Sequence, residues 1–152
     1  MKKILLSFLI LSTLCFTSIQ SSNALTNQAI ITQVFEDGSY IEETIEESSS
    51  ITRSTITKTK TSTYRGADGS ALWSVSVKGT FSYNGSTATC TKSEVSKKNY
   101  SLTWKLSNAK ASKSGNKAIA SVKATEYTSN GAISRTINKT VTLTCSPKGV
   151  LS

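Results

Sequence analysis

The chain has 152 residues, and its 18 lysines and arginines against 9 aspartates and glutamates give a net charge of +9. It contains no histidine, which excludes Ser-His-Asp and Cys-His catalysis and leaves no imidazole to complete a zinc site. A strongly basic chain is expected to attract anionic partners, although lysines scattered over a Ser/Thr-rich sheet also keep it soluble and protect its edges.

The first 24 residues have the features of a secretory signal peptide. Lys2 and Lys3 precede an apolar run from Ile4 to Phe16, and Ser22-Asn23-Ala24 resembles a cleavage site. The run has 13 residues, well below the roughly 20 that a membrane-spanning helix needs. We therefore expect an exported chain that begins at about Leu25.

Charge divides the exported chain into two segments. Residues 25–50 carry six acids and no base, whereas residues 51–152 carry sixteen bases and three acids. We expect an acidic N-terminal segment at 25–50, which is an outer hairpin, a pro-region or a tether, and one basic domain at 51–152. The acidic segment suits docking on the basic domain, where it would mask lysines until it is removed.

Turn signals at short intervals separate segments in which apolar and polar residues alternate, which is typical of an all-β protein. The turn signals are Asp37-Gly38, Ala67-Asp68-Gly69, Asn84-Gly85, Ser114-Gly115-Asn116 and Asn130-Gly131. Residues 71–83 alternate most clearly, with Trp73, Val75, Val77 and Phe81 in one row, and a shorter strand places Leu102, Trp104 and Leu106 inward. The sequence predicts an antiparallel β-sandwich, and immunoglobulin-like architecture is one form that such a fold takes.

The hairpin over residues 55–83 has two alternative registers. A two-residue turn at Asp68-Gly69 would put Lys58 and Lys60 on the face of Trp73, whereas a three-residue loop at 67–69, with Gly69 left-handed, puts them on the opposite face. Burying two lysines beside Trp73 is costly, so we expect the three-residue loop and an inner row of threonines. Lys58 then lies opposite Lys78, and the cluster of Lys58, Lys60 and Lys78 is the candidate anion contact.

The last hairpin, over residues 118–145, is predicted pair by pair from a two-residue Asn130-Gly131 turn. Glu126 faces Arg135 beside the turn. The inward row continues with Ala124 opposite Ile137, Val122 opposite Lys139, Ala120 opposite Val141 and Ala118 opposite Leu143. Small residues thus face large ones, and Lys139 is the one charge in the row without an assigned partner.

The two cysteines outside the signal peptide, Cys90 and Cys145, both continue inward rows, so we predict a disulfide between them in the core. Two cysteines without a histidine do not make a metal site, and we predict no metal and no cofactor. The spacing of Cys90, Trp104 and Cys145 resembles the immunoglobulin pattern, although Leu143 stands where the tyrosine corner would be.

Several short motifs within residues 51–152 carry a resemblance to known proteins. They include Ile56-Thr57-Lys58-Thr59-Lys60-Thr61, Leu72-Trp73, Gly79-Thr80-Phe81-Ser82-Tyr83-Asn84-Gly85-Ser86, Cys90-Thr91 and Leu143-Thr144-Cys145. Through them the chain resembles the small, Ser/Thr-rich secreted proteins of Gram-positive bacteria related to clostridia. The resemblance implies secretion and a β-sandwich, and it transfers no site.

Together these features predict a secreted protein without enzymatic activity. Its acids outside the N-terminal segment, Asp68, Glu94 and Glu126, are assigned to a turn, a loop and an ion pair rather than to a catalytic pair. The leading hypothesis is a binding module that associates electrostatically with anionic cell-envelope polymers or a lipid surface, with no specific nucleic acid. The alternatives are a membrane-active or pore-forming hairpin protein, and a structural or adhesive surface protein with a protein partner.

Overall fold

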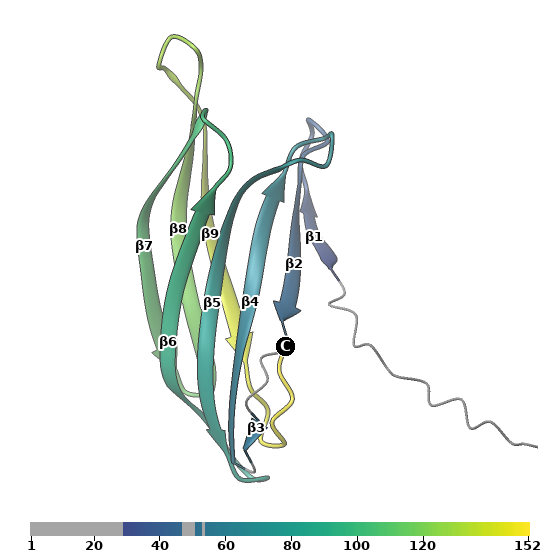
Figure 1. Cartoon of the computed structure of the whole chain (residues 1–152), viewed down its shortest axis with the longest axis vertical. Coiled ribbons are helices and arrows are strands. Elements are labelled where there is room, and N and C mark those ends of the chain that lie inside the picture. The colour runs from purple at the N-terminus through teal and green to yellow at the C-terminus, as the bar shows by residue number, and fades with distance from the viewer. Residues whose placement is uncertain (1–28, 47–50, 53) are drawn as a thin grey trace, which may run out of the picture.

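The computed structural model describes residues 29–46, 51–52 and 54–152, so the predicted signal peptide at 1–24 lies outside the described residues. The described chain forms two antiparallel sheets that pack face to face, as Figure 1 shows. One sheet has the order β1-β2-β4-β5-β6, with the short β3 also paired to β4, and the other has the order β7-β8-β9. The predicted all-β antiparallel sandwich is confirmed.

The strands are β1 (Ile30–Val34), β2 (Tyr40–Glu46), β3 (Ile51–Thr52), β4 (Thr55–Arg65), β5 (Ala71–Tyr83), β6 (Ala88–Asn99), β7 (Trp104–Ser114), β8 (Lys117–Tyr127) and β9 (Ile133–Thr144). The described residues include no helix that is long and apolar enough to cross a membrane. The predicted strand that contains Leu102 is wrong at its start, because Leu102 lies fully exposed in the turn before β7.

The core lies where the inner rows of β5 and β8 meet. Large side chains of β5, such as Trp73 and Phe81, face the buried alanines of β8. Gly79 lies between them, where a Cβ atom would be 2.6 Å from the Phe81 ring and 2.8 Å from the Ala118 Cβ. Glycine is therefore needed here to leave space for the aromatic ring between the sheets.

Four turns share one design, a three-residue loop whose last residue is a left-handed glycine. These glycines are Gly38, Gly69, Gly131 and Gly149, with φ between +79° and +83°. In the loop at 67–69, Gly66 N–H donates to Ser70 O at 2.9 Å, which confirms the predicted three-residue loop. The two-residue turn predicted at Asn130-Gly131 is wrong, because Thr128 N–H donates to Ala132 O at 2.9 Å and encloses three residues.

A β-bulge follows the loop at 67–69 and shifts the register predicted for the first hairpin by one residue. Arg65 pairs with Ala71 but Tyr64 pairs with Trp73, so Leu72 is an extra residue on β5. Beyond it the pairing places Lys60 opposite Val77 and Lys58 opposite Gly79, on the inner face. The predicted opposition of Lys58 and Lys78 is therefore wrong, and the threonines expected on the inner row lie on the outer face.

The same device leaves the predicted register of the last hairpin intact. Tyr127 pairs with Ile133 and Glu126 with Arg135, so Ser134 is the extra residue. The bulge offsets the longer loop, and all five predicted pairs are present, from Glu126 with Arg135 to Ala118 with Leu143. Both hairpins thus combine a three-residue loop with a one-residue bulge.

The described part of the acidic N-terminal segment is a hairpin that extends the first sheet. β2 pairs with β4 along its whole length, from Tyr40 with Arg65 to Glu46 with Thr59. Its Ile41 is fully buried in the core. The hairpin thus supplies both an edge and part of the interior of the sandwich.

Candidate functional site

The structure does not bring the three predicted anion-contact lysines together. Lys78 lies exposed on the outer face of the first sheet, whereas Lys58 and Lys60 lie on its inner row. The outer face around Lys78 also has mixed charge, because Glu94 pairs with Lys92 at 3.0 Å and Glu42 pairs with Arg65 at 2.6 Å. This face therefore offers no extended field of one sign.

The inward lysines of both sheets meet a glutamate from the acidic hairpin. Glu43 Oε2 lies 3.2 Å from Lys60 Nζ, and Glu43 Oε1 lies 2.9 Å from Lys139 Nζ. All three side chains are only 15–18% exposed. Burial acts to raise the pKa of Glu43, but the two ammonium groups outweigh it and hold that pKa below its usual value. This bridge between the sheets gives Lys139 its partner.

A second polar link between the sheets lies near the turn of the acidic hairpin. The buried Tyr64 hydroxyl donates to Ser39 Oγ at 2.7 Å and accepts from Arg135 Nη1 at 2.5 Å. Arg135 also pairs with Asp37 and lies over the Phe35 ring. The hydrogen bonds from Ser39, followed by the Arg135 contact, lower the pKa of Asp37 to about 2. Every charge in this group has a partner, so we assign it to holding the hairpin in place.

The two cysteines lie close to the same turn at the other end of the sandwich. Cys90 N–H donates to Gly115 O at 2.8 Å and Cys145 N–H donates to Asn116 O at 3.0 Å. Both side chains are buried, and both cysteines are free thiols in this structure, so the predicted disulfide is not seen here. Burial raises the pKa of each thiol, which keeps them protonated and poorly nucleophilic at neutral pH.

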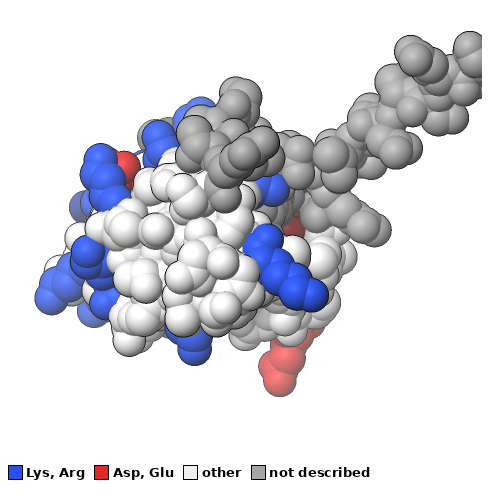
Figure 2. Space-filling model, turned by 90° about the horizontal axis from the view of Figure 1, so that it is seen from below, with Lys and Arg blue, Asp and Glu red and all other residues white. Residues whose placement is uncertain are grey.

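The outer face of the second sheet is the most uniform charged surface of the described chain. We call it the basic face and define it by its four exposed lysines, Lys105, Lys110, Lys117 and Lys123. The single acid of β7, β8 and β9, Glu126, lies on the inner row opposite Arg135. In Figure 2, which looks along the sandwich from one end, basic side chains gather mainly on the side where β6 and β7 lie in Figure 1.

A β-bulge in β7 shapes the centre of the basic face. Ser107 pairs with Lys123 and Lys110 pairs with Ser121, so two residues of β7 lie opposite one of β8. Asn108 in this bulge has φ +54°, and it is the one described non-glycine residue with positive φ. Asn adopts the left-handed conformation more readily than most residues, so Asn108 suits this bulge. The bulge in turn redirects the side chains around it.

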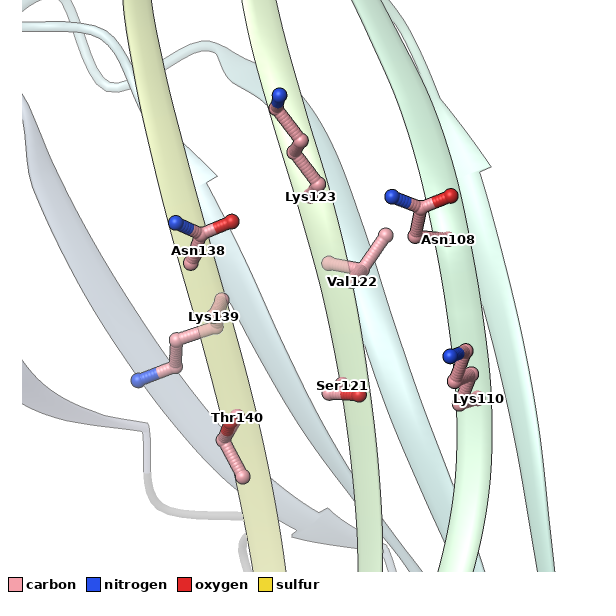
Figure 3. Close-up of a pocket in the computed structure, with 8 residues that line it drawn as sticks. All are labelled: Asn108, Lys110, Ser121, Val122, Lys123, Asn138, Lys139 and Thr140. Carbon is pink, nitrogen blue, oxygen red and sulfur yellow. The ribbon is translucent and has the colours of Figure 1, made fainter.

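An open hollow of about 220 Å³ lies beside the bulge. As Figure 3 shows, side chains from all three strands surround it, and Lys139 turns away from the others. The polar groups are the ammonium ions of Lys110 and Lys123, the amides of Asn108 and Asn138, and the hydroxyls of Ser121 and Thr140. Two ammonium ions and several neutral donors without a carboxylate suit an anion.

The sequence carries a signal for this bulge that alternation alone does not reveal. The inward residues change parity along β7, from Trp104 and Leu106 to Ala109, which is partly buried against the core. The shift turns Lys110 outward, and Asn108 marks where it occurs. An interpretation of β7 with a break at Asn108 would have located the site.

Among the described residues no group of histidine, cysteine, aspartate or glutamate side chains is arranged to hold a metal ion. Comparison with known proteins adds no candidate, because no family model, no curated protein and no solved structure matches this chain. The basic face and its hollow are therefore the features on which a functional assignment rests.

Proposed function

We propose that this protein is a secreted, non-enzymatic binding module that associates electrostatically with anionic polymers of the cell envelope through the basic face. The observation that carries the proposal is the segregation of charge on the second sheet. Four exposed lysines share its outer face and the only acid of its three strands points inward. Such a surface attracts polyanions and holds them by contacts that salt screens.

Co-sedimentation of the mature protein with purified Gram-positive cell walls, across a salt series, tests the proposal. Parallel samples contain anionic liposomes that enclose a dye, so that leakage would reveal membrane activity. Two triple variants make the test specific. One replaces Lys105, Lys110 and Lys123 of the basic face with Gln, and the other replaces Lys78, Lys92 and Lys98 of the first sheet.

The two variants are matched in charge and in one local contact. Each loses three positive charges, and each loses a lysine that lies over a tyrosine ring, Lys105 at 4.9 Å from Tyr127 or Lys98 at 5.0 Å from Tyr100. A lysine near an anionic surface contributes about 1 kcal/mol, so the basic-face variant should bind roughly a hundredfold more weakly. Equal loss in both variants, or no wall binding at low salt, would contradict the proposal.

The proposal includes export and a disulfide between Cys90 and Cys145. Support for the disulfide comes from the two buried cysteines, one in β6 and the other just after β9, whose backbone N–H groups donate to the consecutive turn residues Gly115 and Asn116. Oxidised glutathione would accept two electrons and two protons from the thiols as the bond forms. Closing a loop of 55 residues should stabilise the domain by about 2–4 kcal/mol. Mass spectrometry of secreted protein should show a chain that starts at Leu25 and lacks two hydrogens, whereas retained free thiols would refute the disulfide.

A second candidate function, an adhesive surface protein with a protein partner, is favoured by the edge strand β1. Its Ile30, Ile31 and Val34 are 58–68% exposed, and β1 has no lysine or proline to discourage strand addition. The simplest partner is β1 of a second copy. Light scattering over a concentration series should then detect a dimer that Ile31→Lys dissociates, and a wild type that stays monomeric would argue against this function.

A further inference from the structure

We propose that the hollow beside the β7 bulge is a binding site for a phosphate group of a phosphodiester polymer. This inference deepens the proposed function, on which it rests, by assigning one ligand class and one place on the basic face. The hollow is lined by donor side chains from three adjacent strands, and no carboxylate is among them.

The pairing of the strands explains how the donors converge. Lys123 of β8 lies in register with Asn138 of β9, and the next outward row contains Lys110, Ser121 and Thr140. The bulge adds Asn108 between these rows. Neighbouring strands are about 4.8 Å apart, so donors on β7 and β9 begin roughly 10 Å apart, a gap that one tetrahedral oxyanion with hydrogen bonds on either side fills.

The donor side chains are available to a ligand. Among the described residues none of the side-chain groups of Asn108, Lys110, Lys123 and Asn138 takes part in a hydrogen bond or an ion pair. Lys139 of β9, in contrast, points to the inner face and pairs with Glu43. Amides and ammonium groups gathered without acceptors would gain charge-assisted hydrogen bonds from an anion.

The types of donor favour phosphate over carboxylate. A carboxylate is planar and is best matched by the two-pronged guanidinium of arginine, and the hollow contains no arginine. Lysine acts as a point charge toward phosphate, and amide and hydroxyl donors arranged on several sides suit a tetrahedral ion. Asn108, at the centre of this surface, adopts the uncommon left-handed conformation. Such conformations are typical of functional positions.

Titration of the 15N-labelled mature protein with inorganic phosphate, with sodium acetate at equal ionic strength as the control, tests the site. Phosphate should shift the side-chain amide signals of Asn108 and Asn138 saturably, and acetate should not. Asn108→Gly removes the amide but keeps a residue that favours positive φ, so the bulge should persist while phosphate binding weakens about tenfold. Lys123→Gln should weaken it similarly, and Lys78→Gln on the other sheet should leave it unchanged.

The outcomes separate this site from the broader function. If walls still bind but phosphate does not saturate, or if Asn108→Gly and Lys123→Gln titrate like Lys78→Gln, the site is refuted and the electrostatic function stands. If phosphate binds in the predicted way but walls do not, the site stands and the envelope function falls. Soluble poly(glycerol phosphate) should compete for the site more strongly than phosphatidylglycerol vesicles, and preference for the vesicles would overturn the assignment to a polymer.

Discussion

Replacing Glu43 by Gln removes the negative charge that bridges Lys60 and Lys139 between the sheets. At 3.2 and 2.9 Å, and with an effective dielectric constant of about 20, each pair has a gross attraction of about 5–6 kcal/mol. Desolvation of the three groups offsets much of this attraction. Because the variant leaves two largely buried ammonium groups without a counter-charge, we expect the free energy of unfolding to fall by about 2–4 kcal/mol.

Urea denaturation at pH 7 measures the change, with Glu94→Gln as the matched control. Glu94 also pairs with a lysine, at 3.0 Å from Lys92, but its side chain is 47% exposed and the loss should be below about 1 kcal/mol. The difference between wild type and Glu43→Gln should be complete above pH about 4.5, the ordinary pKa, and should close as the pH falls through the lowered pKa of folded Glu43. Equal destabilisation by Glu43→Gln and Glu94→Gln would refute the inward register of β4.

Three further predictions concern single positions. Ser62 is fully buried and its hydroxyl has no hydrogen-bond partner among the described residues, so Ser62→Ala should raise the free energy of unfolding by about 1 kcal/mol, and destabilisation in urea would reveal a missed partner. Gly79→Ala places a methyl group against the Phe81 ring and should destabilise by about 1–3 kcal/mol, whereas an unchanged midpoint would show that the ring has room to move. NMR titration should find the pKa of Asp37 near 2, so that its contribution to stability is present above pH 3.8 and is lost toward pH 2, and Ser39→Ala should raise that pKa.

The fold and its turns could be predicted from the sequence because both depend on local chemistry. Alternation in residues 71–83 identified the longest strand, and Asp-Gly or Asn-Gly pairs located the hairpin turns. The last hairpin was right in register for an incomplete reason, since a longer loop and a bulge offset each other. In both hairpins the bulge lies on the strand beyond the turn, at Leu72 and at Ser134, so the Asp-Gly and Asn-Gly pairs located the turns but not the bulges.

The prediction that Lys58 and Lys60 face outward is wrong because it omits the pairing of β2 with β4. An isolated lysine is costly to bury, but the acidic segment supplies Glu43 as a partner to Lys60 of the basic domain. In the structure β2 brings that carboxylate to the inner row, and a paired lysine is far less costly to bury than an isolated one. Predicting the Glu43 bridge would require knowing that the acidic strand β2 pairs with the basic strand β4 in one sheet.

The acidic hairpin also determines which positive side chains of the described residues are paired and which remain unpaired at the surface. Two of its acids neutralise inward or inter-sheet cations, since Glu43 engages Lys60 and Lys139 and Asp37 engages Arg135. Because these acids lie on the first sheet and between the sheets, none of them covers the basic face. Asp37 and Glu43 therefore do not lie over the lysines that we assign to anion binding. The hairpin removes charge from the interior, where charge opposes folding, and leaves the charge of the second sheet unopposed, where it faces solvent and a polyanion can reach it.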